Sequence, residues 1–291
     1  MICLDNEWQG IGMIIMNERH AIITGGSSGI GKAIAIQLAC QGYSITIIAR
    51  DQNKLAQAAE DIFLHCRKEK QRVLALAADV SEKTSLQKAI NKAVKAHGDP
   101  DVLITSAGIA HPDYFDNLET EVFEKTMAIN YFGSLYAVQA VFPYMKQKQS
   151  GHIVVISSGA GLLGFFGYSA YSPSKFAIRA LAESLRPEFK RLGIHISVAY
   201  PPDTDTPQFA QENLTKPEET KKITGSIKLW SADDVARCIV NGMDKNKFHI
   251  TPGLSIRLLR LLHSLLFNPL NYYFDKIAAV KKNSETKIAK E

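Results

Sequence analysis

The glycine-rich segment from Gly25 to Gly31 constrains the fold of this 291-residue chain more than any other feature. It follows a short apolar run at residues 20–24, and a helical pattern continues over residues 32–41. Strand, glycine turn and helix in this order are the context in which a helix N-terminus binds a dinucleotide pyrophosphate. Gly25 permits the tight turn, Gly29 lets the backbone approach the phosphates, and Gly31 lets the helix pack closely on its strand.

Apolar runs and helical patterns alternate along the rest of the chain. Strands are predicted at residues 44–49, 72–77, 101–105, 152–156, 194–200 and 247–251, and helices at 53–70, 83–97, 120–146 and 172–192. This alternation is typical of parallel β-α-β units in one doubly wound sheet, which binds its ligands at the carboxyl ends of the strands. We therefore predict an α/β fold with a single Rossmann-type domain at residues 16–253 and an amphipathic C-terminal helical extension at 254–291.

Composition excludes several classes of protein. The four cysteines are scattered without a Cys-x-x-Cys pair, which favours a reduced intracellular compartment and no metal site. The net charge is +5, but no basic patch with interleaved aromatic residues occurs, so we expect no nucleic-acid partner. No uncharged apolar window reaches ~18 residues, so no transmembrane helix is expected. The expected location is the cytoplasm, with peripheral membrane contact left open.

The end of the second predicted strand bears on cofactor choice. In dinucleotide-binding folds an acidic residue here bonds the free ribose 2′-hydroxyl of NAD. Ala49 offers no carboxylate, whereas the Arg50 guanidinium can pair with the 2′-phosphate of NADP. Asp51 fits better as the cap of the next helix. NADP is therefore favoured over NAD, with a merely solvated Arg50 as the alternative.

Three residues with acid–base chemistry follow the strand predicted at 152–156. Ser158 comes just after this strand, and Tyr171 and Lys175 lie four apart, on one face of a helix. An ammonium beside a phenol favours the phenolate and lowers the phenol pKa. Together the three could hold a carbonyl oxygen and protonate it. The alternative is an ordinary strand, turn and helix with a surface Tyr and Lys.

These motifs together resemble the short-chain dehydrogenase/reductase family over about residues 18–251. The resemblance implies a catalytic tetrad of Asn130, Ser158, Tyr171 and Lys175, in which Asn130 holds a water that relays protons to Lys175. It also implies that Asp79 accepts from the adenine and that Thr206 contacts the nicotinamide amide. The full set of expected cofactor contacts is Thr24, Gly25, Ser27, Ser28, Gly29, Ile30, Gly31, Arg50, Asp79, Val80, Ala107, Gly108, Tyr171, Lys175, Pro201, Thr204 and Thr206.

Two departures from the family pattern are visible. The usual Asn-Asn-Ala-Gly is Thr105-Ser-Ala-Gly, and the usual Pro-Gly after the sixth strand is Pro201-Pro202. The stretch at residues 200–207, followed by Phe209, Glu212-Asn213 and residues 216–220, resembles a subfamily, the 3-ketodihydrosphingosine reductases. This implies NADPH-dependent reduction of 3-ketosphinganine, a long-chain amino-ketone lipid, to sphinganine. The alternatives are a reductase of another hydrophobic ketone, such as a steroid, and a catalytically idle NADP-binding protein.

Two segments near the C-terminus bear on the lipid. Asp203 or Asp205 could pair with the substrate ammonium. For one of them, capping of the following loop is an interpretation at least as well supported. Residues 254–280 combine a leucine-rich face with Arg and Lys, and Pro269 is expected to break them. They fit a helix in a membrane interface, where the basic residues Arg257, Arg260, Lys276, Lys281 and Lys282 would meet anionic headgroups. A lid and an oligomer-packing helix are the alternatives, and a homo-oligomer is left open. A disordered tail is expected at 284–291.

Overall fold

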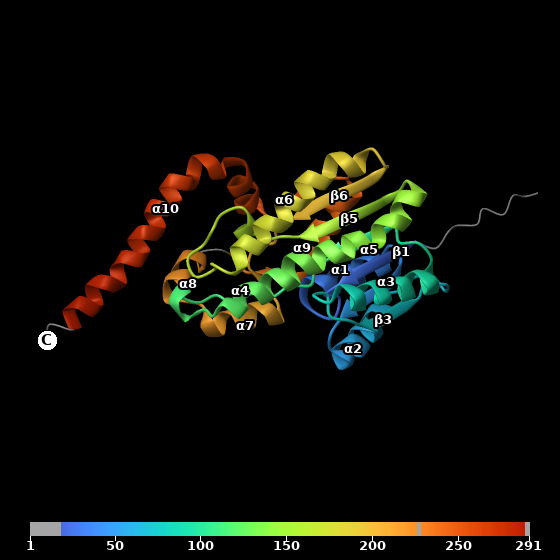
Figure 1. The fold of residues 1–291 in the computed structure, drawn as a ribbon, viewed down its shortest axis with the longest axis horizontal. Helices are drawn as coiled ribbons and strands as arrows, with labels where there is room; N and C mark the ends of the chain where they lie inside the picture. Colours follow the sequence, from blue (N-terminus) through green and yellow to red (C-terminus); the bar gives the residue numbers. More distant parts are fainter. Residues whose placement is uncertain (1–18, 226–227, 289–291) are drawn as a thin grey trace, which may run out of the picture.

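The computed structural model describes residues 19–225 and 228–288. In these residues, seven parallel strands form one sheet in the order β3-β2-β1-β4-β5-β6-β9 (Figure 1). The strands are β1 His20–Thr24, β2 Ser44–Ala49, β3 Val73–Ala77, β4 Val102–Thr105, β5 Gly151–Ile156, β6 Ile194–Ala199 and β9 His249–Ile250, and a separate pair consists of β7 Thr204–Asp205 and β8 Trp230–Ser231. The predicted doubly wound α/β fold is confirmed.

The helices of the described residues cover both faces of this sheet. They are α1 Gly29–Cys40, α2 Gln52–Phe63, α3 Lys83–His97, α4 Thr120–Met127, α5 Gly133–Lys148, α6 Tyr171–Lys190, α7 Pro207–Thr215, α8 Glu218–Thr224, α9 Ala232–Asp244 and α10 Leu254–Ile288. Strand side chains alternate between two cores. Ile22 packs with α3, α5 and α6, whereas its neighbour Ile23 packs with α1, α2 and α9. Both isoleucines are fully buried.

Two predicted helices differ from the observed ones. The helix expected at 53–70 ends at Phe63, where the chain turns toward β3. The helix expected at 120–146 is α4 and α5 joined by a π-helical turn at Ala128–Phe132, which contains Asn130. Such turns insert one extra residue into the helix and occur often at functional sites. A 3.6-residue hydrophobic period does not distinguish them from a regular helix.

The C-terminal helix α10 begins at Leu254, at the predicted start of the extension. Contrary to our expectation, Pro269 does not break the segment, because it lies inside α10. Figure 1 shows instead that α10 bends and that its C-terminal arm extends away from the sheet. The helix continues to Ile288, through most of the expected disordered tail. Residues 16–18 of the predicted domain and residues 289–291 of the tail lie outside the described residues.

None of the helices in the described part of the chain combines the length and the hydropathy needed to cross a membrane.

Candidate active site

A cavity of about 420 Å³ opens at the carboxyl ends of the central strands. It brings together most of the residues predicted from sequence: Gly25, Ser27, Ser28, Gly29, Ile30, Arg50, Asp79, Val80, Ala107, Gly108, Ser158, Tyr171, Lys175, Pro201, Asp203, Thr204 and Thr206 all line it. Thr24, Gly31, Asn130 and Asp205 are not among the residues that line it. Gly31 and Asn130 lie behind the wall, as described below. Thr24 is buried and accepts from the Ala107 backbone N–H at 3.5 Å, and Asp205 is exposed.

The glycine turn has the geometry that a bound pyrophosphate requires. Gly25 and Gly29 have φ angles of +70° and +52°, which side chains rarely tolerate. A Cβ atom on Gly31 would lie 2.3 Å from the Gly25 oxygen, so this glycine permits the close packing of α1 on the turn. Ser28 is the N-cap of α1, but its side chain caps no backbone N–H. The first-turn N–H groups are therefore available to an anion.

The other end of the cavity lies beside β2 and β3. Arg50 is exposed there, and Asp51 caps α2 by accepting from the Lys54 backbone N–H at 3.0 Å, as predicted. The Asp79 carboxylate accepts from the backbone and hydroxyl of Ser81 at 2.9 and 2.6 Å. Burial acts to raise the pKa of Asp79, but the bonds from Ser81 and the charge of Arg50 outweigh it and lower that pKa. Asp79 is therefore an ionised acceptor next to a cation.

Ser158, Tyr171 and Lys175 meet at the centre of the cavity. Ser158 is the second residue after the end of β5, and its hydroxyl accepts from the Ala160 backbone N–H at 3.1 Å. Tyr171 is the first residue of α6, and Lys175 follows one turn later. The Lys175 ammonium donates to the Ile156 carbonyl at 3.1 Å and lies 5.5 Å from the centroid of the Tyr171 ring. Both side chains are buried, so the surface Tyr and Lys of the alternative interpretation are excluded.

Asn130 braces this centre from behind. Its side-chain oxygen accepts from the Ile109 backbone N–H at 2.8 Å, and its amide donates to the Ile109 carbonyl and the Ser174 hydroxyl, both at 2.9 Å. The π turn thus ties the segment after β4 to the first turn of α6. A Cβ atom on Gly108 would lie 3.2 Å from the Asn130 oxygen and 3.5 Å from the Lys175 ammonium. Asn130 therefore lies close to Lys175, although it is not in the cavity wall.

Burial dominates the ionisation of the central pair. It raises the pKa of Tyr171, the Glu212 charge raises it further, and hydrogen bonds with Ser158 and Gln208 lower it. Burial also lowers the pKa of Lys175 to about 8, against the opposing influence of Glu212. We had expected Lys175 to lower the phenol pKa. In the structure, desolvation by burial is the largest influence on the Tyr171 pKa and raises it, so the phenol is held neutral, and the Lys175 ammonium is easily deprotonated.

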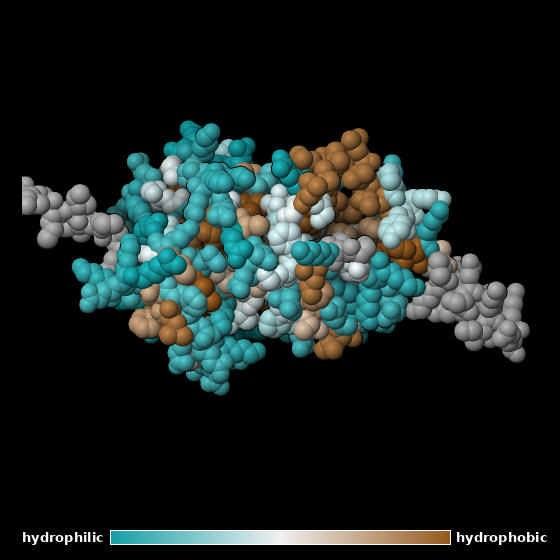
Figure 2. Space-filling model, turned by 180° about the vertical axis from the view of Figure 1, so that it is seen from behind, coloured by the Kyte–Doolittle hydropathy of each residue, from teal (hydrophilic) through white to brown (hydrophobic). Residues whose placement is uncertain are grey.

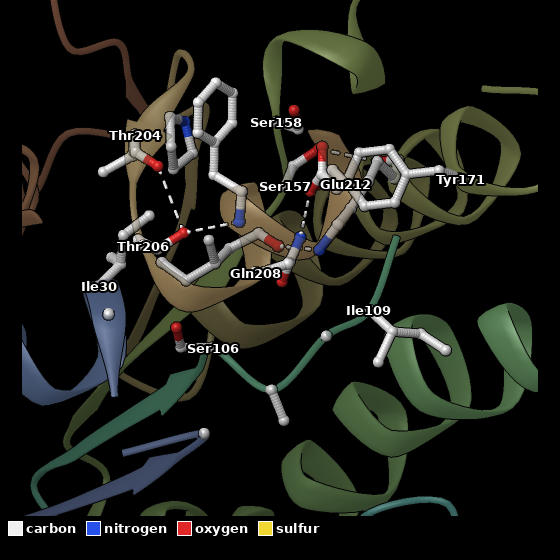
Figure 3. Close-up of a pocket in the computed structure, with 18 of the residues that line it drawn as sticks. Ile30, Ser106, Ile109, Ser157, Ser158, Tyr171, Thr204, Thr206, Gln208 and Glu212 are labelled. Carbon is white, nitrogen blue, oxygen red and sulfur yellow. Dashed lines mark hydrogen bonds between the residues drawn. The ribbon is translucent and has the colours of Figure 1, made fainter. Parts of the chain in front are cut away.

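Sequence reasoning missed three residues next to Tyr171, namely Tyr168, Gln208 and Glu212. The Glu212 carboxylate, on α7, accepts from the Tyr168 hydroxyl and from the Gln208 amide, both at 2.9 Å. Figure 3 shows Glu212 between Gln208 and Tyr171, on the same side of the cavity as Ser158. Glu212 is buried and lines the cavity. Its only sequence signal was its place in a stretch that resembles one subfamily, and this gave it no role.

The fold and the cavity are those of a dinucleotide-binding oxidoreductase. The family model described as short chain dehydrogenase matches residues 19–217, and the chain belongs to this family. Levodione reductase has a similar fold, with a TM-score of 0.73 and 24% identity over 80% of this chain and 94% of that one. An alcohol dehydrogenase from Thermococcus sibiricus, complexed with 5-hydroxy-NADP, has a TM-score of 0.68 and 25% identity over 80% of this chain and 95% of that one.

Curated relatives are more similar in sequence. A 3-ketodihydrosphingosine reductase from Bos taurus is 46% identical over 80% of this chain and 71% of the relative. A 3-dehydrosphinganine reductase from Danio rerio is 44% identical over 80% of this chain and 70% of the relative. A 3-ketodihydrosphingosine reductase from Dictyostelium discoideum is 42% identical over 91% of this chain and 83% of the relative. The similarity to these relatives therefore covers most of the chain and is not confined to the shared motifs.

Proposed function

We propose that this protein is an NADPH-dependent reductase that converts 3-ketosphinganine into sphinganine in sphingolipid synthesis. The observation that carries the proposal is the buried group of Ser158, Tyr171 and Lys175, which opens into the same cavity as the glycine turn. The choice of substrate is supported by relatives of 42–46% identity, which are named as reductases of this ketone.

The residues of the cavity fit a nicotinamide dinucleotide. The first turn of α1 would hold the pyrophosphate. Gly29 leaves its backbone uncovered there, whereas a side chain at this position would be strained by the φ angle of +52° and would crowd Thr206, with its Cβ only 3.0 Å away. Arg50 would pair with the 2′-phosphate, and Asp79 would accept from the adenine amino group. Lys175 would hold the nicotinamide ribose. When bound, NADPH supplies the hydride for the ketone carbon.

Proton transfer falls to the side chains of the chain itself. Tyr171 is a neutral phenol in the buried site and donates its proton to the ketone oxygen, while the Ser158 hydroxyl holds that oxygen by a hydrogen bond. Lys175, with a pKa of about 8, exchanges protons near neutral pH and can restore the phenol. Asn130 fixes the Ile109 backbone beside this lysine. We propose that it also holds the water of a proton relay.

The cavity wall continues into α10, which suggests a route for a long acyl chain. Ser255, Ile256 and Leu259 of α10 line the cavity. Further along, eight of the fifteen exposed large hydrophobic side chains in the described structure belong to α10. They are Leu254, Leu258, Leu261, Leu262, Leu265, Phe267, Tyr272 and Tyr273. Figure 2 shows a hydrophobic patch at the end of the molecule where α10 lies.

We propose that this face of α10 contacts a lipid membrane. Arg257 and Lys276 are exposed on the same helix and would meet anionic headgroups; the side chains of Lys281 and Lys282, which we also expected to do so, lie outside the described residues. A lid role of α10 is also compatible with this proposal. The ring centroid of Phe274 on α10 lies 5.9 Å from that of Phe165, which lines the cavity. The substrate could then enter from the membrane without crossing water.

The test is to incubate purified protein and NADPH with 3-ketosphinganine, a steroid ketone and a β-ketoacyl thioester. We expect NADPH oxidation with 3-ketosphinganine and formation of sphinganine. Preferential turnover of the steroid or the thioester would favour the reductase of another hydrophobic ketone. No turnover of any ketone, with NADPH bound, would favour an idle binding protein.

A further inference from the structure

Glu212 occupies a position that is hard to explain for a reductase of a neutral ketone. Its carboxylate is buried in the cavity wall and bonds to Tyr168, whose ring centroid lies 5.6 Å from that of Tyr171. A ketone oxygen gains negative charge during reduction, and so does a phenol that gives up its proton. A fixed carboxylate nearby opposes both changes. A cation bound beside Glu212 would cancel this opposition.

Among the described residues this carboxylate has no direct ion-pair partner, although its charge acts on the Lys175 ammonium from a longer distance. Both hydrogen-bond donors to Glu212, Tyr168 and Gln208, are neutral. Within the described residues, no lysine or arginine forms an ion pair with it at 4.0 Å or less. Lys216 lies near the same cluster, but its ammonium packs 4.6 Å from the centroid of the Phe209 ring. The carboxylate therefore faces the cavity with bonding capacity left over.

The proposed substrate carries a cation where one is needed. In 3-ketosphinganine the amino group is on the carbon adjacent to the ketone. When the ketone oxygen lies at Tyr171 and Ser158, the ammonium group must lie within a few ångströms of it. We propose that Glu212 recognises this ammonium group and so determines specificity for amino ketones. This inference rests on the proposed function and adds to it the residue that reads the polar end of the substrate.

Two carboxylates favoured by sequence are less suited to this role. Asp205 is exposed on β7, and its neighbour Thr204 is the residue that points inward. Asp203 lines the cavity, but Lys216 already acts on it as a nearby cation. Glu212 is more deeply buried than either aspartate. It is also the charged group that acts most strongly on both Tyr171 and Lys175.

The test compares Glu212→Gln with wild type on 3-ketosphinganine and on 1-hydroxyoctadecan-3-one, its analogue without the amine, in the same micelles. Gln keeps the shape and an oxygen acceptor for Tyr168 but loses the charge. We expect KM for the amino ketone to rise at least about tenfold, the loss typical of a charge-assisted hydrogen bond. Turnover of the analogue should be unchanged or faster, and NADPH binding, measured by fluorescence, should be retained. Glu218→Gln, an exposed glutamate on α8, is the matched control and should behave as wild type.

Three results would overturn the assignment. Equal losses on both substrates would make Glu212 a structural support for α7. A rise in KM confined to the amino ketone in Asp203→Asn, but not in Glu212→Gln, would transfer the role to Asp203. If the wild-type protein reduces both ketones equally well, it does not recognise the ammonium group, although its proposed function as a reductase would stand. Failure of wild type to reduce 3-ketosphinganine at all would instead contradict the proposed function.

Discussion

The two halves of the cavity are built by different means. The half at the strand ends, which we call the catalytic half, consists of the glycine turn, Ser158, Tyr171 and Lys175, all within or next to parallel β-α-β units. The other half, the substrate half, consists of α7, α8 and the first turns of α10, which follow the last central strands. The catalytic half positions backbone N–H groups and proton carriers, and the substrate half presents a buried carboxylate and an apolar helix face.

This difference separates chemistry from recognition. Residues of the catalytic half would serve any ketone, because in the proposed mechanism they act on the ketone oxygen and the dinucleotide. Residues of the substrate half bear on what is attached to the ketone, namely a cation on one side and a long acyl chain on the other. Substitutions in the two halves should therefore have distinguishable consequences, which the following predictions use.

The largest effect is expected for Tyr171→Phe in the catalytic half. Removing the hydroxyl removes the transferable proton, so kcat should fall by ~10²–10⁴-fold. NADPH binding, measured by fluorescence titration, should remain nearly intact, and every ketone should be affected alike. In contrast, Lys175→Ala should weaken both turnover and cofactor binding. Substantial turnover by the Phe variant would remove Tyr171 from its role.

The next largest effect is expected on membrane binding in the substrate half. Leu258, Leu261 and Leu265 are 43%, 55% and 77% exposed, so replacing all three by Gln should leave the fold intact. Burial of each leucine in lipid is worth about 1.5–3 kcal/mol, and sedimentation with anionic vesicles should therefore be lost. Turnover of a short soluble analogue should persist. A variant that still sediments would place the membrane contact elsewhere. A chain ending at Pro252 is a harsher test, because it also removes the buried Ile256.

The buried ammonium of Lys175, in the catalytic half, should lower the free energy of unfolding of the protein. Burial lowers its pKa from 10.5 to about 8, which corresponds to a cost of about 3 kcal/mol while the folded lysine stays protonated. Between pH 8 and 10.5 the unfolded chain binds more protons, so this cost fades as pH rises. The free energy of unfolding of Lys175→Met, relative to wild type, should therefore decline by about 3 kcal/mol from pH 7 to 10.5. Denaturant titrations can measure this, with exposed Lys92→Met as control. A difference independent of pH would contradict the shift.

The smallest effect is expected at the cofactor's 2′-phosphate. Arg50→Ala should weaken NADPH binding by ~1.5–3 kcal/mol, the worth of a charge-assisted contact, and should barely change NADH binding. Arg72→Ala, which removes an exposed arginine just before β3, is the matched control. Equal losses for both cofactors in a fluorescence titration would show that Arg50 does not distinguish them.

Local patterns made the catalytic half predictable. The Gly25–Gly31 spacing and the four-residue step from Tyr171 to Lys175 are properties of a turn and of a helix, and both appear in the structure as expected. The π turn around Asn130 was not predictable, because one inserted residue leaves no visible mark on a helical pattern.

The substrate half depends on contacts between distant residues, which sequence patterns do not contain. Glu212 reaches Tyr171 through Tyr168, which is 44 residues earlier in the chain. Asp203 and Asp205 looked equivalent in the sequence, but only Asp203 lines the cavity. Asp205 lies on β7 and points to the side opposite its neighbour Thr204, which is buried and lines the cavity. The bend of α10 likewise appears only in the folded arrangement (Figure 1).

The most direct test of the central claim follows deuterium from C4 of labelled NADPH into the lipid product. Purified protein, 3-ketosphinganine and NADPH deuterated on the transferred face should yield sphinganine that carries one deuterium at C3, detected by mass spectrometry. The same mixture with Tyr171→Phe should yield almost none. Sphinganine without deuterium, or labelled product from a steroid ketone but none from 3-ketosphinganine, would contradict the account.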